Sequence, residues 1–336
     1  MKNRNEILNL AGKKVLIIRL SSLGDILLTT PFLRTLKSKY HGIKLDFILK
    51  KQYRDALLNN PNISELYFYE KDKKYIEKLI SDLIKEDYDI VIDLQNNFRS
   101  SAITRALNIG TYRFNKRILD KFLLVKFKIN NLKHAPPVPV RYASTLPDFD
   151  LDEEGLELLS PNHPAGLIGG KNKLIGFAPG SRHYTKMWPK EYFQRLGNFL
   201  VESGYNVVLF GGKDDIPVCS VISGQIPGSI NLCGEDDLLQ TAVDMKQCRV
   251  VVCNDSGMMH TACAMKIPVL AIWGSSVKEF GFTPYKNNNL ILENNSLTCR
   301  PCSHIGRERC PKGHFKCMLE TGPEKTYEAL MKFLEN

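Results

Sequence analysis

The chain has 336 residues, of which 43% are hydrophobic and 24% charged, and its formal net charge is +10. This length exceeds one ordinary hydrophobic core and predicts two domains, and the balanced composition excludes disordered and fibrous proteins. No apolar run approaches the roughly 18 residues of a membrane-spanning helix and nothing reads as a signal peptide, so we expect a cytoplasmic protein.

Basic residues are concentrated in the first half of the chain. Residues 1–150 hold 27 Lys and Arg against 16 Asp and Glu, whereas residues 151–336 hold 19 against 20. Such an excess favours an anionic partner, which can be nucleic acid, an acidic membrane surface or a phosphorylated substrate, with a merely soluble surface as the alternative. The densest stretch, residues 113–129, interleaves Lys and Arg with Phe, Ile and Leu. That mixture suits either a segment at an acidic membrane surface or a solvated helix packed on its own domain.

Apolar runs alternate with helical patterns along the chain. Strands are predicted at 15–20, 45–49, 65–69 and 90–94, helices at 26–40, 53–59, 74–86 and 98–107, and further strands at 174–178, 206–210, 229–232, 249–253 and 268–272. A polar, proline-bearing passage, 134–164, predicts a linker. Strands separated by helices predict parallel sheets, so the fold class is α/β, with two doubly wound, Rossmann-like domains, 1–150 and 151–336, facing a cleft.

Ligands of such sheets bind at the carboxyl ends of the strands, so the loops that follow the strands are the candidate sites. Residues 21–25 (SSLGD) end in Asp25, which either caps a helix or does chemistry. In the loop after residue 178, Gly180 and Ser181 allow close approach to an oxyanion. Lys186 follows them and is either a point charge for a phosphate or a surface lysine.

Two further loops carry candidate ligands. Residues 211–215 (GGKDD) offer Asp214 or Asp215 as a helix cap or as an acceptor of ribose hydroxyls. Residues 253–260 (CNDSGMMH) place Asp255 and small residues at a helix N-terminus, where free N–H groups bind phosphate, although Asp255 can also be a plain cap. The sequence has neither a Walker loop nor a dinucleotide fingerprint, which weakens ATP-hydrolysis and NAD hypotheses.

These motifs together resemble glycosyltransferase family 9, the heptosyltransferases of lipopolysaccharide inner-core synthesis. The matching segments are 21–25, 177–181, 186–189, 208–212 and 254–260, with acceptor-domain resemblance at 93–100 and 141–142. They fall in order over about residues 13 to 330 and look closest to the heptosyltransferase II branch. The resemblance implies a GT-B fold and an inverting, metal-independent transfer of heptose. ADP-heptose would bind mainly to the second domain, and the lipid A–Kdo/heptose acceptor to the first.

The resemblance also implies roles for individual residues. Asp25 is the expected general base, and Lys186 is the expected stabiliser of the diphosphate charge. The expected donor-binding residues are Gly180, Ser181, Lys186, Asp214, Asp255, Ser256, Gly257, Met258 and His260. The expected acceptor-binding residues are Ser22, Gly24, Asn96, Arg99 and Arg141. No cofactor is required for this chemistry, and we expect a monomer that contacts the cytoplasmic face of the inner membrane and binds no nucleic acid.

Two further patterns concern metal. Four of the nine cysteines, Cys299, Cys302, Cys310 and Cys317, have the spacing of a structural zinc site, with reduced thiols that stabilise a C-terminal loop as the alternative. Asp148, Asp150 and Asp152 form the D-x-D pattern by which GT-A transferases hold a divalent ion. Because these residues lie in the predicted linker, we interpret them as solvated loop charge.

Three alternatives to the heptosyltransferase hypothesis stay open. One is a family 9 transferase with another sugar nucleotide or acceptor, because the motifs read the diphosphate and not the sugar. Another is a basic nucleic-acid-binding protein, although no nucleic-acid module or aromatic platform is present. The third is a sugar-nucleotide-binding protein without activity.

Overall fold

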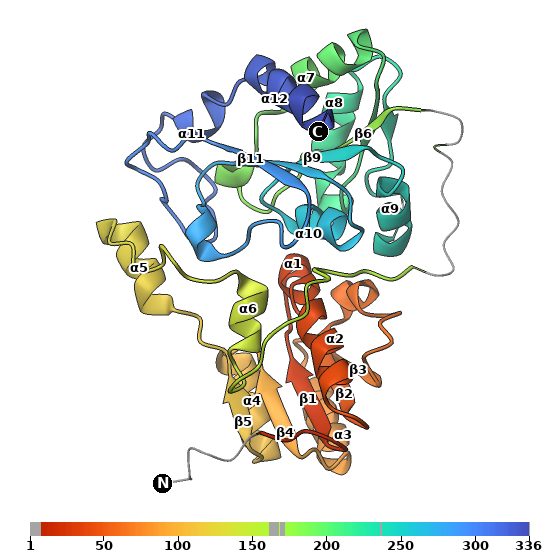
Figure 1. The fold of residues 1–336 in the computed structure, drawn as a ribbon, viewed down its shortest axis with the longest axis vertical. Helices are drawn as coiled ribbons and strands as arrows, with labels where there is room; N and C mark the ends of the chain where they lie inside the picture. The colour runs from red at the N-terminus through yellow and green to blue at the C-terminus, as the bar shows by residue number, and fades with distance from the viewer. Residues whose placement is uncertain (1–7, 161–167, 169–171, 236, 336) are drawn as a thin grey trace. The chain divides into compact units, whose positions relative to one another are not determined.

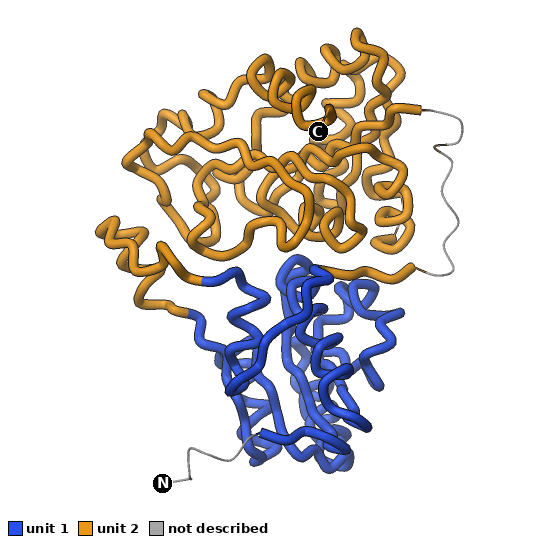
Figure 2. The backbone as a smooth tube through the Cα atoms, viewed as in Figure 1, with its two compact units in different colours: residues 1–116, 136–155 blue, residues 117–135, 156–336 orange. Residues whose placement is uncertain are grey.

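The computed structural model describes residues 8–160, 168, 172–235 and 237–335. The chain forms two compact units, which Figure 2 distinguishes by colour. Unit 1 comprises residues 1–116 and 136–155, and unit 2 comprises residues 117–135 and 156–336. Each unit is an α/β fold around one parallel sheet, which confirms the predicted fold class of two Rossmann-like domains (Figure 1).

The sheet of unit 1 has the order β3-β2-β1-β4-β5, and every neighbouring pair is parallel. Its strands are β1 (Lys14–Ile18), β2 (Lys44–Lys50), β3 (Glu65–Tyr69), β4 (Ile90–Asp93) and β5 (Thr111–Arg113). Four of them confirm the predicted strands. β5 was not predicted, because it has only three residues and none of them is buried.

The helices of unit 1 are α1 (Leu23–Leu27), α2 (Thr30–Lys39), η1 (Lys51–Ala56), α3 (Lys73–Lys85), α4 (Phe98–Leu107) and α6 (Val138–Ala143). The prediction of one helix over 26–40 is wrong. Pro31, at the start of α2, lacks the N–H that a continuous helix needs. The hydroxyl of Thr29 donates to the carbonyl of Ile26, three residues earlier, and so helps to close the first helix. The predicted helix 53–59 is a 3₁₀ helix that begins and ends earlier.

The prediction that residues 134–164 form a linker is wrong for 136–155, which packs on unit 1. Tyr142 of α6 is fully buried. The ring of Phe149 packs edge-on against Phe32 at a centroid distance of 5.3 Å and stacks on Tyr40 at 6.3 Å. These aromatic side chains bury apolar area that a solvated linker would expose. The predicted linker residues 161–164 lie outside the described residues.

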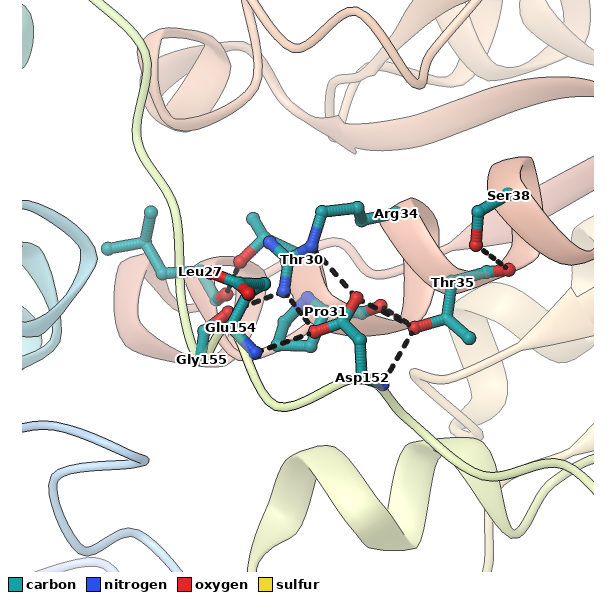
Figure 3. A network of polar contacts seen from close by, with 9 residues as sticks. All are labelled: Leu27, Thr30, Pro31, Arg34, Thr35, Ser38, Asp152, Glu154 and Gly155. Carbon is teal, nitrogen blue, oxygen red and sulfur yellow. Dashed lines mark hydrogen bonds and ion pairs between the residues drawn. The ribbon is translucent and has the colours of Figure 1, made fainter.

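Asp152 anchors the end of this segment to α2 (Figure 3). Its Oδ1 lies 2.5 Å from Arg34 Nη2, and its Oδ2 accepts from Arg34 Nε at 2.9 Å and from Thr35 Oγ1 at 3.1 Å. The prediction of solvated charge is therefore wrong for Asp152, whereas Asp148 and Asp150 are exposed. The cause is bidentate pairing, which fixes a carboxylate on an arginine fork.

We expect Arg34→Gln to lower the free energy of unfolding by about 1 kcal/mol at neutral pH, because the pair is only partly buried. Burial on its own would raise the pKa of Asp152, but the hydrogen bonds from Arg34 hold this pKa below its ordinary 3.8. The pair's contribution is therefore complete above the unfolded pKa and is lost as pH falls through the lower folded pKa. Urea unfolding of the parent and of Arg34→Gln, at pH 7 and at pH ~2, measures this loss of stability. A difference in the free energy of unfolding that persists at pH ~2, below the ordinary carboxylate range, would contradict the prediction.

The sheet of unit 2 has the order β11-β10-β9-β6-β7-β8, again parallel throughout. Its strands are β6 (Leu174–Ala178), β7 (Asn206–Leu209), β8 (Ile230–Asn231), β9 (Val250–Asn254), β10 (Val269–Trp273) and β11 (Asn289–Glu293). Counted from β6 this is the Rossmann order 3-2-1-4-5-6, whose switch point lies between β6 and β9. The five predicted strands are confirmed, and β11 was missed because it is a half-exposed edge strand.

Several helices of unit 2 pack on this sheet and close its core. The helices of the unit are α5 (Ile118–Phe127), η2 (Tyr184–Lys186), α7 (Lys190–Glu202), η3 (Lys213–Asp215), α8 (Ile216–Ser223), α9 (Leu238–Met245), α10 (Gly257–Ala264), η4 (Lys278–Phe280), α11 (Lys316–Leu319) and α12 (Pro323–Glu335). Phe177, Trp188 and Phe193 form an aromatic cluster at the centre of this core. Among the described residues, no helix is long and apolar enough to cross a bilayer.

Residues 117–135 fall within the predicted first domain, 1–150, but in the structure they belong to unit 2. Leu124 and Leu132 are buried with Phe280 in a small apolar cluster. Lys128 Nζ donates to the carbonyls of Cys299 at 3.1 Å and Pro301 at 2.7 Å. Counted by units, the basic excess is no longer one-sided: unit 1 has 22 Lys and Arg against 18 Asp and Glu, and unit 2 has 24 against 18.

Candidate active site

The strands of unit 2 bring four loops to one edge of its sheet. They follow the carboxyl ends of β6, β7, β9 and β10, and all but the β10 loop carry predicted donor-binding residues. Asn254, which is fully buried, joins two of them: its Oδ1 accepts from the N–H of Trp188 at 3.0 Å, and its Nδ2 donates to the carbonyl of Pro179 at 2.7 Å. This amide therefore fixes the β6 loop against the start of α10.

Lys186 and Asp255 form the charged centre of this edge. Lys186 Nζ lies 2.7 Å from Asp255 Oδ2, and the two side chains are only 14% and 8% exposed. The hydroxyl of Ser276 donates to the same oxygen at 2.6 Å. Burial on its own would raise the pKa of Asp255, but Lys186, Ser276 and His260 lower it below its ordinary value. An ammonium has three donors, so Lys186 keeps hydrogen-bonding capacity beyond this pair.

The N-terminus of α10 lies beside this pair in the sequence. Ser256 precedes the helix, Gly257 begins it, and Met258 on the first turn is half-buried. His260 is buried within the same helix. The hydroxyl of Ser256 is buried and has no hydrogen-bond partner among the described residues. Free N–H groups and the helix dipole make such a terminus suited to phosphate. The alternative that Asp255 is a plain cap is wrong, because Ser256 is the N-cap and the Asp255 carboxylate pairs with Lys186.

Ser181 and Gly180 complete the β6 loop. Ser181 Oγ lies 3.5 Å from the carbonyl oxygen of Asp255, a long hydrogen bond. A Cβ on Gly180 would lie 2.1 Å from Oδ1 of Asp215, so the chain needs glycine here for the close approach of the β6 and β7 loops. Asp215 Oδ2 accepts from the N–H of Gly212 at 3.0 Å, while Asp214, the predicted ribose ligand, is exposed. Burial raises the pKa of Asp215. Asp215 therefore lies closer to the other loops than Asp214 does.

We expect Gly180→Ala to raise the Michaelis constant for the nucleotide sugar about tenfold, because Asp215 must leave the Gly212 N–H to make room for the methyl group. Gly212→Ala is the matched control, since a Cβ there meets nothing within 4 Å. Steady-state kinetics of both variants measure the effect. Equal Michaelis constants for the two would show that the Gly180 contact is unimportant for the donor.

In unit 1 the predicted base lies in a dense polar cluster at the carboxyl ends of β1 and β4. Asp25 Oδ1 lies 2.5 Å from Nη2 of Arg19, and Oδ2 accepts from the N–H of Ser22 at 3.0 Å and from its hydroxyl at 2.8 Å. The capping geometry that the sequence suggested is thus present, and so is an ion pair that it did not suggest. Gly24 is buried in α1.

Arg19 is the residue that holds Asp25. It is 7% exposed, Nη1 donates to the carbonyl of Leu94 at 2.7 Å, and the guanidinium lies over the Tyr142 ring at 5.6 Å. Burial on its own would lower the pKa of Arg19, but the charge of Asp25 raises it. A cation held against a carboxylate favours its ionised form. A carboxylate in the ionised form is the one that accepts a proton.

The turn after β4 supports the same cluster. Gln95 Oε1 accepts from the N–H of Leu20 at 2.9 Å, which ties the β1 turn to the β4 turn. Asn96 Nδ2 donates to the carbonyl of Phe114 at 2.8 Å. Arg99, at the start of α4, has its guanidinium 5.2 Å from the centre of the Phe98 ring.

Arg141 behaves differently from the other predicted acceptor ligands. It is buried in α6, and its Nε donates to the carbonyl of Pro136 at 2.6 Å. Its role as an acceptor ligand stays a prediction.

The sequence did not indicate several residues of these two clusters. Ser275 and Ser276 follow β10, and Arg300 donates to the carbonyls of Gly274 at 2.6 Å and Ser276 at 2.9 Å, which fixes that turn. Lys116 lies near Arg19 and Asp25, and burial together with Arg19 lowers its pKa. The available signals were the Gly-Ser-Ser run at a strand end and the arginine that ends the first apolar run.

The four clustered cysteines lie in the C-terminal part of unit 2. Among the described residues, which include all four, no group of three or more His, Cys, Asp or Glu is placed to hold a metal ion. Cys317 is buried in the apolar core on α11, and Cys299 Sγ lies 3.8 Å from Nε2 of His314. Cys302 and Cys317 nevertheless interact electrostatically with the other cysteines of the cluster, so the structural zinc site stays a prediction.

Comparison with known proteins places the chain among glycosyltransferases. Residues 76–312 match the family model described as glycosyltransferase family 9 (heptosyltransferase). The chain belongs to glycosyltransferase family 9 and is a glycosyltransferase. It is 28% identical to lipopolysaccharide heptosyltransferase 2 of Salmonella typhimurium, over 96% of this chain and 98% of that protein.

Solved structures give the same fold. A family 9 glycosyltransferase from Veillonella parvula has a TM-score of 0.79 and 21% identity, covering 98% of this chain and 99% of that one. ADP-heptose lipopolysaccharide heptosyltransferase II of E. coli has a TM-score of 0.70 and 24% identity, covering 96% and 98%. The predicted GT-B fold is confirmed by these neighbours.

Proposed function

We propose that this glycosyltransferase transfers heptose from ADP-heptose to the inner core of lipopolysaccharide. The observation that carries the proposal is the buried Lys186–Asp255 pair next to the N-terminus of α10, at the carboxyl edge of a Rossmann-ordered sheet. The full-length relative named above supports the choice of sugar and acceptor. A structure of the E. coli heptosyltransferase WaaC with ADP-2-deoxy-2-fluoro heptose, at a TM-score of 0.68 and 19% identity, supports the same donor.

Unit 2 stabilises the leaving group of the reaction. Negative charge grows on the ADP diphosphate as the anomeric carbon is attacked. Lys186, the hydroxyls of Ser181 and Ser256 and the N–H groups at the start of α10 stabilise this charge. Asp255 holds the ammonium of Lys186 in place, and Met258 and His260 line the donor site. The carboxylate that accepts the ribose hydroxyls is Asp214 or its neighbour Asp215, which points at Gly180.

Unit 1 binds the acceptor and activates its hydroxyl group. Asp25 takes the proton of the acceptor hydroxyl while that oxygen attacks the anomeric carbon opposite ADP, so the configuration inverts. The two hydrogen bonds from Ser22 and the ion pair with Arg19 orient the carboxylate before the reaction. Asn96, Arg99 and Arg141 are the proposed ligands of the sugar acids and phosphates of the acceptor.

No step of this scheme needs a metal ion, because Lys186 and the helix N-terminus supply the positive charge at the diphosphate. Transfer should therefore continue in excess EDTA.

The protein acts as a monomer at the cytoplasmic face of the inner membrane, where the lipid-anchored acceptor lies.

The test is ADP release that depends on both ADP-heptose and a lipid A–Kdo acceptor. Release with ADP-heptose and the acceptor, but not with the acceptor omitted, supports the proposal. Release with other sugar nucleotides only would favour a family 9 transferase of different donor specificity. Titration with ADP and with single-stranded DNA separates the other classes, because tight DNA binding without ADP binding would indicate a nucleic-acid-binding protein.

A further inference from the structure

Helix α5 and the residues after it present large apolar side chains to solvent. Ile118 is 71% exposed, Leu119 68%, Phe122 54%, Phe127 57% and Ile129 50%. Of the fifteen large hydrophobic side chains that are exposed in the described residues, these five fall within one stretch of the chain. Isolated exposed apolar residues are ordinary, but a cluster of this kind marks a surface that binds another apolar phase.

Three of the exposed side chains share one side of the helix. Ile118 and Phe122 are four residues apart and lie on one face, and Leu119 flanks them. The Phe122 and Phe127 rings meet edge to face at 5.9 Å. Leu124 lies on the other side and is buried. The helix is thus apolar on two sides: the side with Leu124 is covered by unit 2, and the side with Ile118 and Phe122 is exposed.

The same segment is held firmly by unit 2. Leu124 and Leu132 pack with Phe280, and Lys128 donates to two carbonyls of the 299–301 segment. Arg117 and Asp120 form an ion pair across the first turn, at 2.9 Å. The exposed face is therefore carried on an anchored element and is not the result of a loose tail.

Charge indicates what covers this face. Residues 117–135 contain five Lys and Arg against one Asp, whereas residues 156–336 contain 19 against 17 acidic residues. Most of the positive excess of unit 2 therefore lies on this one segment. Lys126 and Lys133 are exposed beside the apolar side chains. Aliphatic and aromatic groups flanked by lysines suit the boundary between anionic headgroups and acyl chains.

We infer that α5, with Ile129, is an interfacial element that inserts Ile118, Leu119, Phe122 and Phe127 into an acidic lipid surface. The inference deepens the proposed function, since it names the part of the chain that meets the membrane of the lipid-anchored acceptor. A second copy of the chain is the competing occupant, and it would bring like charges together on this strongly basic segment.

The first test is flotation with vesicles of phosphatidylcholine, with and without about one-third phosphatidylglycerol. The protein should float with the acidic vesicles only. Ile118→Gln, Leu119→Gln and Phe122→Gln together should lower the partition coefficient about tenfold or more, because Gln keeps the helix and removes the apolar face. The matched control combines Leu58→Gln, Ile84→Gln and Val221→Gln, exposed side chains elsewhere in the chain, and should float like the parent.

The second test does not depend on a loss of binding. Phe122→Trp adds an indole where both native tryptophans are buried, so its emission should shift to the blue and be quenched by brominated acidic lipid. Equal flotation of the two triple variants, or an introduced indole that stays unquenched in vesicle-bound protein, would overturn the inference. So would a concentration-dependent dimer that the α5 triple variant abolishes. ADP affinity, measured on the same samples, reports separately on the proposed donor site and should be unchanged.

Discussion

Replacing Asp25 by Asn should lower the turnover number by about 100-fold or more and leave the affinity for ADP nearly unchanged. Asn keeps an oxygen that can accept from the N–H and hydroxyl of Ser22, so the capping geometry survives. It cannot accept the proton of the acceptor hydroxyl. Single-turnover transfer and ADP titration of the same preparation separate the two effects.

The variant also leaves Arg19 buried without its counter-ion, so some loss of stability is expected and needs a control. Asp152→Asn is the matched variant, because it too removes a carboxylate from an arginine pair in unit 1. It should keep turnover within about twofold of the parent, as expected for a partly exposed pair that is not among the proposed catalytic or acceptor-binding residues. An active Asp25→Asn enzyme would remove Asp25 from the mechanism, and an equally inactive Asp152→Asn would assign the loss to folding.

The second large effect is expected at Lys186. Lys186→Met should lower turnover by about 100-fold or more, because it removes the cation nearest the proposed diphosphate site. It should also lower the free energy of unfolding by about 3 kcal/mol, because the buried carboxylate of Asp255 loses its partner.

Adding Asp255→Asn to Lys186→Met distinguishes the two roles. The double variant contains no unpaired buried charge, so thermal unfolding should recover much of the lost stability while turnover stays low. Lys190→Met is the control, since that lysine is only four residues away and its side chain is 49% exposed. Recovery of activity in the double variant would mean that Lys186 serves only to neutralise Asp255.

The sheets and the candidate loops could be predicted because their signals are local. Buried parallel strands are short continuous apolar runs, and a glycine or carboxylate directly after such a run lies at the ligand-binding edge of the sheet. Asp25, Lys186 and Asp255 were found in the loops that follow such runs. Strands β5 and β11 lack such runs and were missed.

The residues that support the site could not be predicted in the same way. Arg19 looked like the polar end of a strand, and its ion pair depends on the turn back through α1. Arg300 reaches the carbonyl of Gly274 from 26 positions along the chain. The same limit explains why residues 136–155 were wrongly predicted as a linker. Their local composition is that of a linker, and the contacts of Phe149 with Phe32 and Tyr40 form only when the chain folds back onto α2.

The most direct measurement of the proposed activity is the mass of a truncated lipopolysaccharide acceptor after incubation with ADP-heptose. We expect a gain of one heptosyl residue on an acceptor that ends in Kdo or in a first heptose, with stoichiometric release of ADP. The same reaction with Asp25→Asn should give little product in the same time. An unchanged acceptor mass for every acceptor of the series, with a protein that binds ADP, would contradict the proposed transfer.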